Sequence, residues 1–583
     1  MRRRVDCHRA PVSHHAWLGM CLLASLAATW SLPSRAQTSA FAAPRVLEHR
    51  VVAGDTLEQL ARRYLGDAQR WTDLQNHNRV PSPYRLQPGS VLEIPLHLLR
   101  MASASVDYVQ GSAQVQRAGT TAPVARGASL QEGDRLQLDP DAFVSVRLAD
   151  GSTVRVQAGS QLSLSQLRRR GRAGSLQSVV EVEQGGVDIR VPGGADAQRR
   201  LDVITPVAAT SVRGTQFDVQ LGADGSATTA VLQGRVGVQS LNDVQRQQSG
   251  MTLPRHMGVA VDAQGQASAA RARLPAVDGQ LLPRLNEDAQ WLNLPLPAAP
   301  EVHAWRVAVT ADAPGDQVLR NGMFTAPLAR FAAIADGNYY LHVRPVDDLG
   351  ISGLPTTAPL RVKAHPVPPL LQVPAPDAVL PLGQAQLQCT PVDGVHTYRH
   401  QIVTLASAEA TPAAADFAQP GWQHASTTTC QMDLGQLPAG SYAWRAASVR
   451  TVDGVEDQGP FAVAQRFRIE PPPPTPSLDD LKVQTVAGVS SIHWPGEPGQ
   501  RFRLQAFDQP DGTTPALDTL LDAPQWQAAG LPAGTWHVRI QVQDPNGLTS
   551  AFSPPRSVRI LPLVRDGSGA PVQSGTGLGV EHP

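Results

Sequence analysis

Lysine is nearly missing from this chain of 583 residues: only Lys363 and Lys482 are present, so almost all of the 50 basic residues are arginines. The basic residues are balanced by 50 acidic ones, which gives a formal net charge of zero. A protein with this balance lacks the overall positive field that draws nucleic-acid-binding proteins to their ligand. We therefore expect no nucleic acid among its partners.

Long apolar runs are also scarce. The one at residues 16–30 has 15 residues, fewer than the roughly 20 that a membrane-spanning helix needs. Four arginines precede this run and the triplet Ser34-Arg35-Ala36 follows it, an order typical of a secretory signal peptide. We expect residues 1–36 to be removed during export, which leaves no transmembrane segment in the mature chain. An uncleaved anchor is the alternative, and lipidation at Cys21 is disfavoured because Met20 precedes it.

Motifs that would indicate an enzyme are missing too. The chain has no His-Glu-x-x-His zinc motif, no Gly-x-Ser-x-Gly nucleophile elbow, no phosphate loop and no dinucleotide fingerprint. Its histidines are scattered without the spacing of metal ligands, at positions 256, 303, 342, 365 and 396 among others. We predict a protein without catalytic residues, metal or cofactor; an unrecognised pair of carboxylates is the alternative.

Residues 45–97 form a dense module after the signal segment. The expected order is strand, helix, helix, strand, with the strands at 49–52 and 91–95 and the second helix at 71–78. We expect the first helix to follow Asp55 as its N-cap, with Glu58 completing a capping box.

This module resembles the LysM family. The match rests on Gly54-Asp55-Thr56-Leu57, on Leu74 followed by Asn78, and on the stretch from Leu86 to Pro95 with Pro88-Gly89 at its turn. His49 and Ser90 stand where the family often has Tyr and Gln. The resemblance implies binding of glycan that contains N-acetylglucosamine, usually peptidoglycan in bacteria, between two loops. The implied glycan-binding residues are Gly54, Asp55, Thr56, Leu57, Asn78, Arg79, Val80 and Pro81.

A purely structural role is the alternative for each of these side chains. Asp55 can serve as a helix cap, Leu57 as a core residue and Asn78 as a helix-end residue. Sugar contacts would then be made largely by the backbone of the two loops.

From residue 105 to 274 the apolar period changes to two. Short alternating segments are separated by glycines, and Asp150-Gly151 marks a tight hairpin turn. This pattern predicts an all-β unit, as a roll, barrel or solenoid.

Part of this unit resembles the FecR domain family, through the segment 203–219 with Thr205-Pro206 and Arg213-Gly214-Thr215. Name-giving members are transmembrane regulators that sense a receptor outside the membrane and control a sigma factor inside. Here a signal peptide and a LysM-like module replace the cytoplasmic domain and the membrane helix, so sigma-factor control is not implied. What the resemblance implies is an extracytoplasmic module for protein interaction.

Two arginine features of this unit have structural explanations. We expect Arg213 to be buried and paired with a carboxylate, beside a turn that Gly214 permits; a binding role of Arg213-Gly214-Thr215 is the alternative. The arginines at 168, 169, 170 and 172 are expected to lie at a solvated hairpin tip, with an anionic glycan or phospholipid as the alternative ligand.

Three diverged copies of one element follow, marked by Gly337, Gly440 and Gly534, which are 103 and 94 residues apart. Each glycine is followed by an aromatic residue and an alternating strand. Units of this length with short strands resemble fibronectin type III-like β-sandwiches. The expected sandwiches are 277–364, 366–470 and 475–562, and the Gly-, Ser- and Pro-rich residues 563–583 are expected to form a disordered tail.

Two cysteines remain after removal of the signal segment, Cys389 and Cys430. In the register of the repeats they fall near Trp494 and Trp526 of the third copy. We infer that both pairs bridge neighbouring inward positions, as a disulfide in one sandwich and as aromatic packing in the other. Two reduced, buried cysteines are the alternative.

These expectations combine in a multidomain, mainly β protein: a small βααβ LysM module, an all-β FecR-like roll or barrel and three β-sandwich repeats. We predict an exported, non-catalytic protein of the periplasm or cell envelope that binds peptidoglycan through residues 45–97. Its FecR-like and sandwich domains would contact an unknown envelope protein. The first alternative is an envelope signalling component whose FecR-like domain contacts a receptor or regulator. A second is an accessory of a glycan-modifying enzyme.

Overall fold

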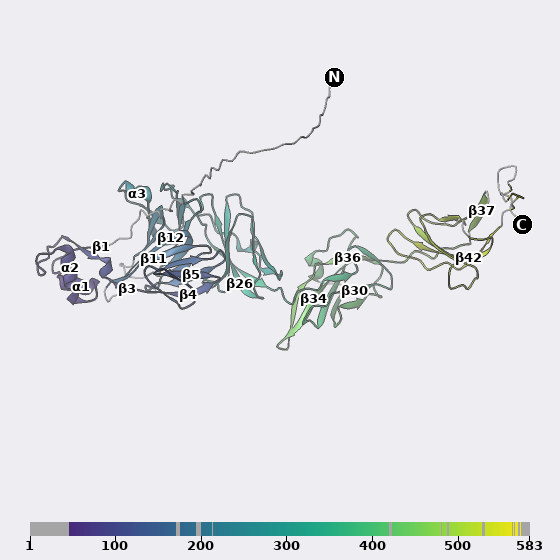
Figure 1. Cartoon of the computed structure of the whole chain (residues 1–583), viewed down its shortest axis with the longest axis horizontal. Coiled ribbons are helices and arrows are strands. Elements are labelled where there is room, and N and C mark those ends of the chain that lie inside the picture. The colour runs from purple at the N-terminus through teal and green to yellow at the C-terminus, as the bar shows by residue number, and fades with distance from the viewer. Residues whose placement is uncertain are drawn as a thin grey trace, which may run out of the picture.

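The computed structural model describes residues 46–170, 175–193, 200–212, 214–418, 422–479, 481–486, 489–527 and 531–561, together with 564, 566–568 and 572. The expected signal peptide at 1–36 lies outside the described residues, as does most of the expected tail at 563–583. A small helical module is followed by four β units, one after another along the chain (Figure 1). The protein is multidomain and mainly β, which confirms the predicted fold class.

The N-terminal module packs two short helices against a two-stranded sheet. Its elements are β1 (Val46–Arg50), α1 (Leu57–Tyr64), η1 (Ala68–Arg70), α2 (Trp71–Asn78), β2 (Val91–Pro95) and η2 (Leu96–Leu98). The two strands pair antiparallel, with His49 opposite Leu92. Leu57, Leu60 and Ala61 share one face of α1 and are buried, because helical spacing places them side by side. Strand, helix, helix and strand therefore follow one another as predicted.

The start of α1 differs from the prediction. Its N-cap is Thr56, whose Oγ1 accepts a hydrogen bond from Gln59 N–H at 3.2 Å. The Asp55 carboxylate accepts a hydrogen bond from Val52 N–H at 2.9 Å instead, inside the preceding turn. Because Asp55 is engaged there, the predicted cap at Asp55 and its capping box with Glu58 are wrong.

The second unit is a closed barrel. Its elements are β3 (Arg100–Met101), β4 (Ala104–Gln110), β5 (Ala113–Arg117), β6 (Thr120–Pro123), β7 (Ser129–Leu130), β8 (Arg135–Leu138), β9 (Phe143–Arg147), β10 (Thr153–Val156), β11 (Gln161–Arg170), β12 (Ser175–Arg190), β13 (Arg200–Ile204), β14 (Ala208–Val212), β15 (Gln216–Leu221), β16 (Ala227–Gln233), β17 (Arg235–Ser240), the helix α3 (Leu241–Gln245), β18 (Met251–Pro254), β19 (Met257–Val261) and β20 (Arg271–Ala272).

The long strand β12 holds the barrel together. Its first half pairs antiparallel with β11 and parallel with β13, and its second half pairs antiparallel with β10 and β15. Alternate residues of these strands point inward, so valines and leucines such as Val180, Val187 and Leu162 fill one continuous core. The other face of β10, β12 and β15 carries Arg155, Asp188 and other polar residues.

The first sandwich follows directly. Its elements are η3 (Gly279–Leu281), β21 (Leu285–Asn286), β22 (Trp291–Pro295), β23 (Ala304–Thr310), β24 (Val318–Phe324), β25 (Leu328–Ala332), β26 (Gly337–Val346) and β27 (Thr356–Val362). The strands form a five-stranded sheet in the order β21-β27-β26-β23-β24 and a two-stranded sheet β22-β25. Leu292 and Leu294 of the smaller sheet and Val307, Leu341 and Val343 of the larger one share one core.

The second and third sandwiches repeat this plan. The second comprises β28 (Leu371–Val373), β29 (Ala378–Pro381), β30 (Gln386–Cys389), β31 (Thr397–Thr404), η4 (Ala414–Ala418), β32 (Trp422–Thr427), β33 (Gln431–Asp433), β34 (Gly440–Val452), β35 (Val455–Phe461) and β36 (Gln465–Glu470). The third comprises β37 (Lys482–Val486), β38 (Val489–His493), β39 (Arg501–Phe507), β40 (Leu517–Leu521), β41 (Gln525–Gln527), β42 (Gly534–Gln543) and β43 (Arg556–Ile560).

The element recognised in the sequence is the same hydrogen-bonded corner in all three sandwiches. Two residues after the marking glycine, Tyr339, Tyr442 and Trp536 each donate to the carbonyl four residues earlier, at 2.9, 2.8 and 2.9 Å. Such a bond fixes the path of the chain as it enters the central strand. The repeat is thus a structural device shared by the three copies.

Candidate functional site

The eight glycan-binding residues predicted from the LysM resemblance lie on two loops of the N-terminal module and at the helix ends next to them, with Leu57 opening α1 and Asn78 closing α2. The first loop joins β1 to α1, and the second leaves the end of α2. Gly54, Arg79 and Pro81 are exposed, whereas Thr56 and Val80 are half-buried. Val80 packs against the core cluster that contains Leu57, so both loops border the same small core.

Asp55 is held by a chain of hydrogen bonds that ends at α1. Asp55 Oδ2 lies 2.8 Å from His49 Nε2, and the Tyr64 hydroxyl lies 2.9 Å from His49 Nδ1. Burial alone would raise the pKa of Asp55, but the hydrogen bonds from Val52 N–H and His49 lower it. The side chain therefore fixes the shape of the first loop, and His49 takes part in this contact from β1.

Leu57 and Asn78 are also committed to the fold. Leu57 is 1% exposed and lies in the core. Asn78 Nδ2 donates to Leu74 O and Glu93 O, and its Oδ1 accepts from Glu93 N–H at 2.7 Å, so Asn78 joins α2 to β2. For these two side chains the structure provides the structural roles given above as alternatives.

The surface that remains available consists of loop backbone and a few exposed side chains. Arg79 ends α2 in the left-handed conformation, with a φ of 51°. Tyr84, which the LysM pattern did not include, is 83% exposed in the second loop, and Val52 is 58% exposed in the first. An exposed tyrosine ring offers a flat apolar face to a sugar. Its sequence signal is an aromatic residue between Pro83 and Arg85, outside any apolar period.

Some of the barrel arginines with an expected role belong to the described residues, and others do not. Arg213 and residues 171–174 lie outside the described residues. Arg168, expected at a solvated tip, is buried: its Nη2 pairs with Glu132 Oε1 at 2.5 Å and its Nη1 donates to Leu99 O at 3.1 Å. That expectation is wrong for Arg168, because β11 pairs antiparallel with β3, the segment that leaves the N-terminal module, and Arg168 lies opposite Met101.

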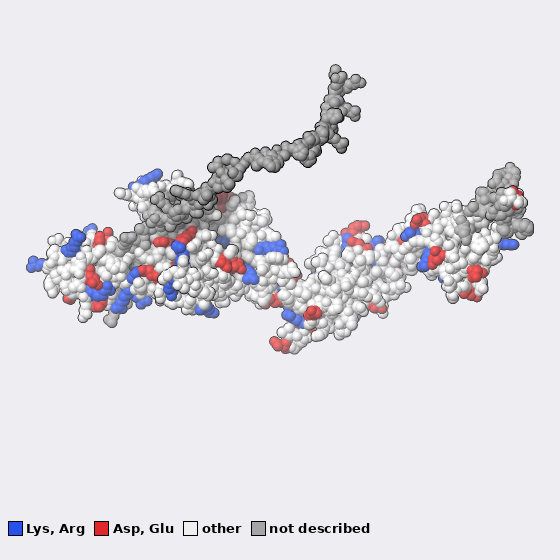
Figure 2. Space-filling view, in the orientation of Figure 1, with Lys and Arg blue, Asp and Glu red and all other residues white. Residues whose placement is uncertain are grey.

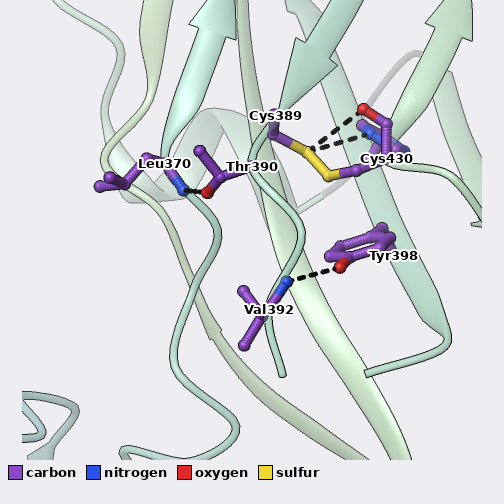
Figure 3. Close-up of a disulfide and its surroundings, with 7 residues drawn as sticks. Leu370, Cys389, Thr390, Val392, Tyr398 and Cys430 are labelled. Carbon is purple, nitrogen blue, oxygen red and sulfur yellow. Dashed lines mark hydrogen bonds between the residues drawn. A yellow bond between two sulfur atoms is a disulfide. The ribbon is translucent and has the colours of Figure 1, made fainter. Parts of the chain in front are cut away.

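The second sandwich contains a buried group of two sulfurs and an imidazole. Cys389 and Cys430 form a disulfide in the structure, with Cα atoms 5.4 Å apart (Figure 3). His400 Nε2 lies 4.0 Å from Cys389 Sγ. Since the disulfide ties up both sulfurs, the group does not offer two thiolates to a metal ion. In the third sandwich Trp494 and Trp526 lie in one core, and the Trp494 ring packs edge-on against Phe502.

On the face seen in Figure 2, neither sign of charge dominates. Arginine and lysine atoms alternate with aspartate and glutamate atoms along the visible face (Figure 2). Within the described part of the chain, no helix is long and apolar enough to cross a membrane.

Comparison with known families agrees with the sequence in two places. The LysM domain model matches residues 49–95, and the FecR protein model matches residues 134–237. The chain therefore carries a LysM domain followed by a FecR domain, as predicted.

Comparison with individual proteins adds less. No curated protein matches the chain. A crystal structure of a candidate anti-sigma factor from Parabacteroides distasonis is 23% identical, with a TM-score of 0.19, and the match covers 24% of this chain and 59% of that one. The FN1–FN3 domains of chicken CNTN1 are 12% identical, with a TM-score of 0.24, and the match covers 49% of this chain and 99% of that one.

Proposed function

We propose that this protein is an exported component of the cell envelope that binds peptidoglycan through its LysM domain and presents its FecR and sandwich domains to another envelope protein. The LysM match is the observation that carries the proposal. The two exposed loops of that domain support it, because a neutral sugar needs backbone donors and acceptors beside an apolar surface.

The glycan contacts are assigned to the exposed part of the predicted site. Gly54, Arg79, Pro81 and Tyr84 offer backbone groups and one ring to the ligand. Asp55, Leu57 and Asn78 contribute by holding the loops in place. The protein acts by binding and has no catalytic step of its own.

A second function is supported by the FecR match at residues 134–237. In that case the barrel contacts a receptor or regulator in the envelope, and the LysM domain keeps it at the wall. The two functions differ in what the protein would capture from an envelope extract. A receptor or regulator that copurifies with the barrel favours signalling.

The experiment that tests wall binding is a sedimentation assay of the purified mature protein with insoluble peptidoglycan sacculi. We expect the full protein to sediment with the sacculi and a chain without residues 45–97 to stay in solution. Leu370→Ala is the control substitution, because Leu370 is 73% exposed and follows the first sandwich. If the full protein stays in solution as the shortened chain does, wall binding is overturned and the signalling function is left.

A further inference from the structure

The FecR barrel and the first sandwich meet through a polar interface. Strands β10, β12 and β15 of the barrel face β23 and β26 of the sandwich across it. Arg306 and Arg344 of the sandwich each place Nη1 near Asp188 Oδ1 of the barrel, at 3.3 and 3.1 Å. In the opposite direction, Arg155 of the barrel pairs with Asp316 of the sandwich at 2.6 Å. The two domains are therefore joined by ion pairs that point both ways.

In this interface, buried arginines outnumber the carboxylates that form ion pairs with them. Four guanidinium groups are well buried, with side-chain exposures of 10, 1, 11 and 17% for Arg155, Arg273, Arg306 and Arg344. They share three carboxylates: Asp188, Asp218, which pairs with Arg273 at 3.4 Å, and Asp316, which is 45% exposed. Asp312 is a fourth carboxylate nearby, and it keeps its negative charge. Its oxygens accept hydrogen bonds from the backbone N–H groups of residues 316 and 317, and it forms no ion pair with the four arginines among the described residues. A buried guanidinium without a close carboxylate is unfavourable unless an anion compensates it.

A cavity of about 150 Å³ opens within this interface. Arg155, Arg306 and Arg344 line it, and Asp188 is the one carboxylate in its lining. Gln220 and Asn321 reach it from the barrel and the sandwich. Gly186 makes room for the Gln220 amide, because a Cβ at Gly186 would lie 2.2 Å from Gln220 Nε2. The cavity is thus built from both domains.

The polar atoms of this lining that lack a partner are donors. Arg306 Nη2, Gln220 Nε2 and Asn321 Nδ2 are buried and find no hydrogen-bond acceptor among the described residues. Each of these nitrogen atoms can donate a hydrogen bond to an oxygen of a ligand, and none of them can bind a cation. His342, also in the lining, has its pKa lowered to about 4 by burial and by the positive charges of Arg344 and Arg155. Burial is the larger cause of this shift, and the two guanidinium groups of the lining add to it.

We propose that this cavity binds a small oxyanion of the size of phosphate or sulfate and thereby joins the FecR barrel to the first sandwich. Guanidinium groups present paired donors that match two oxygens of such an anion. Amide donors from Gln220 and Asn321 complete the shell. The site is independent of the glycan-binding loops, and it makes the contact between the two domains sensitive to the anion.

The test is calorimetric titration of the purified mature protein with phosphate, sulfate, acetate and chloride at constant ionic strength, with the melting curve recorded alongside. We expect saturable binding of phosphate and sulfate, and a rise of the first melting transition that chloride does not produce. Saturable binding of acetate alone would assign the site to carboxylates and overturn the proposed ligand class. No saturable binding of any oxyanion would overturn the site.

Variants place the site. Arg306→Gln is expected to weaken phosphate binding by about tenfold or more, because it removes a charge-assisted donor. Arg503→Gln is the matched control: Arg503 follows Phe502 in the third sandwich as Arg306 follows Trp305 in the first, but it pairs with Asp518 there. Asn321→Asp keeps every arginine and adds a negative charge, so it is expected to abolish binding even if Arg306→Gln fails to fold. Unchanged binding in Asn321→Asp would show that the anion lies elsewhere.

Discussion

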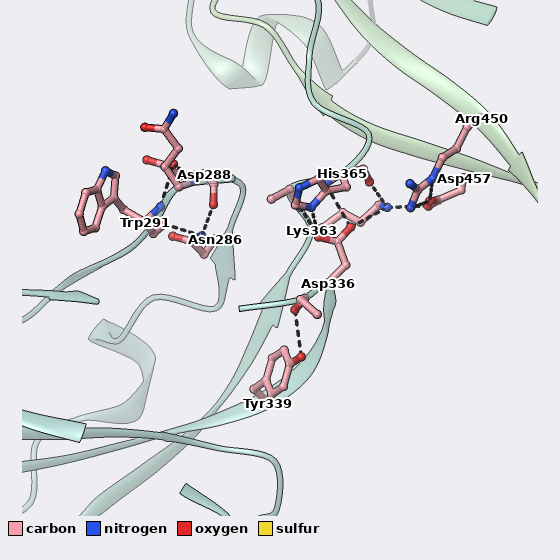
Figure 4. A network of polar contacts seen from close by, with 12 residues as sticks. Asn286, Asp288, Trp291, Asp336, Tyr339, Lys363, His365, Arg450 and Asp457 are labelled. Carbon is pink, nitrogen blue, oxygen red and sulfur yellow. Dashed lines mark hydrogen bonds and ion pairs between the residues drawn. The ribbon is translucent and has the colours of Figure 1, made fainter. Parts of the chain in front are cut away.

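Lys363 Nζ lies 2.5 Å from Asp457 Oδ1 and 3.1 Å from Asp336 Oδ2, so one of the two lysines of the chain joins the first sandwich to the second (Figure 4). Arg450 approaches Asp457 from the other side at 2.9 Å. Gly459 lies directly beside the linker, since a Cβ there would lie 1.8 Å from Pro366 O. The angle between these two sandwiches is therefore set by an ion-pair chain and by close backbone packing.

Replacing this lysine should loosen the joint. In Lys363→Ala we expect a larger radius of gyration and a wider spread of shapes in small-angle X-ray scattering, because Asp336 and Asp457 then repel each other without the ammonium between them. The loss of stability should be small, about 1 kcal/mol, as these groups are partly exposed. Lys482→Ala, at the exposed start of β37, is the control and should scatter like the parent. Identical curves for both variants would mean that packing alone holds the joint.

Asp188→Asn should weaken the contact between the barrel and the first sandwich. The substitution leaves Arg306 and Arg344 buried without their carboxylate, a change that costs about 3 kcal/mol or more. Hydrogen exchange of the amides in β23 and β26, followed by mass spectrometry, measures this region alone. Asp518→Asn, at a half-exposed pair with Arg503, is the control and should change exchange in the third sandwich by less than about 1 kcal/mol. If Asp188→Asn and Asp518→Asn change hydrogen exchange by equal amounts, the buried ion pairs do not stabilise the interface more than an exposed pair stabilises its own domain.

The first sandwich should lose stability as the pH falls below neutral. The folded pKa of His342 is about 4 against an ordinary 6.5, so the unfolded state binds the proton more readily between these values. Stability should fall by about 3 kcal/mol from pH 6.5 to 4 and level off below the folded pKa. Asp188, with its pKa lowered to about 2 by Arg306, Arg344 and Arg155 against the effect of burial, adds a further loss below pH 3.8. Hydrogen exchange of β26 at several pH values in chloride buffer, with His342→Asn for comparison, checks the loss of stability between pH 6.5 and 4.

The disulfide should stabilise the second sandwich. Cys389 and Cys430 are 41 residues apart, and closing such a loop stabilises a domain by about 4 kcal/mol in the chain-entropy model. We expect the free energy of unfolding of the second sandwich, measured in urea, to be lower in the reduced protein than in the oxidised protein by about this amount. The double variant Cys389→Ala, Cys430→Ala should resemble the reduced protein and ignore the reductant. Free thiols in the unreduced, denatured mature protein would contradict the bond.

The glycan site should separate into contact and support residues. Tyr84→Ala removes an exposed ring, so it should weaken sedimentation with sacculi while leaving the fold of the module unchanged. Leu57→Ala should lower the stability of the module by about 2 to 5 kcal/mol, because it empties part of the core. Circular dichroism separates the loss of binding from the loss of fold. If Tyr84→Ala is folded and no longer binds sacculi, the site is supported; if it is folded and binds as tightly as the parent, the Tyr84 ring is not part of the site.

Local pattern made much of the architecture predictable. The turn before α1 and the period-two strands after residue 105 depend on neighbours a few positions away, and the corner aromatic residues Tyr339, Tyr442 and Trp536 repeat with their glycines. Such features constrain backbone angles and the buried face directly, so the βααβ module, the all-β unit and the three copies could be predicted from the chain. The LysM and FecR domains were identified by the resemblance of their motifs to those families. The choice of Asp55 as cap was wrong because two neighbouring residues could both cap a helix, and only the position of His49 on β1 decides between them.

The sequence by itself determined which units form and in what order, because strands, helices and turns follow from the alternation of apolar and polar residues and from glycine at tight turns. The tertiary structure decided what the polar residues do. Arg344 and Asp188 are 156 positions apart, and both occupy outward positions that a strand pattern assigns to solvent. Only when the two domains pack do these charges become buried and paired, since ion pairing depends on approach in space and leaves no periodic trace along the chain.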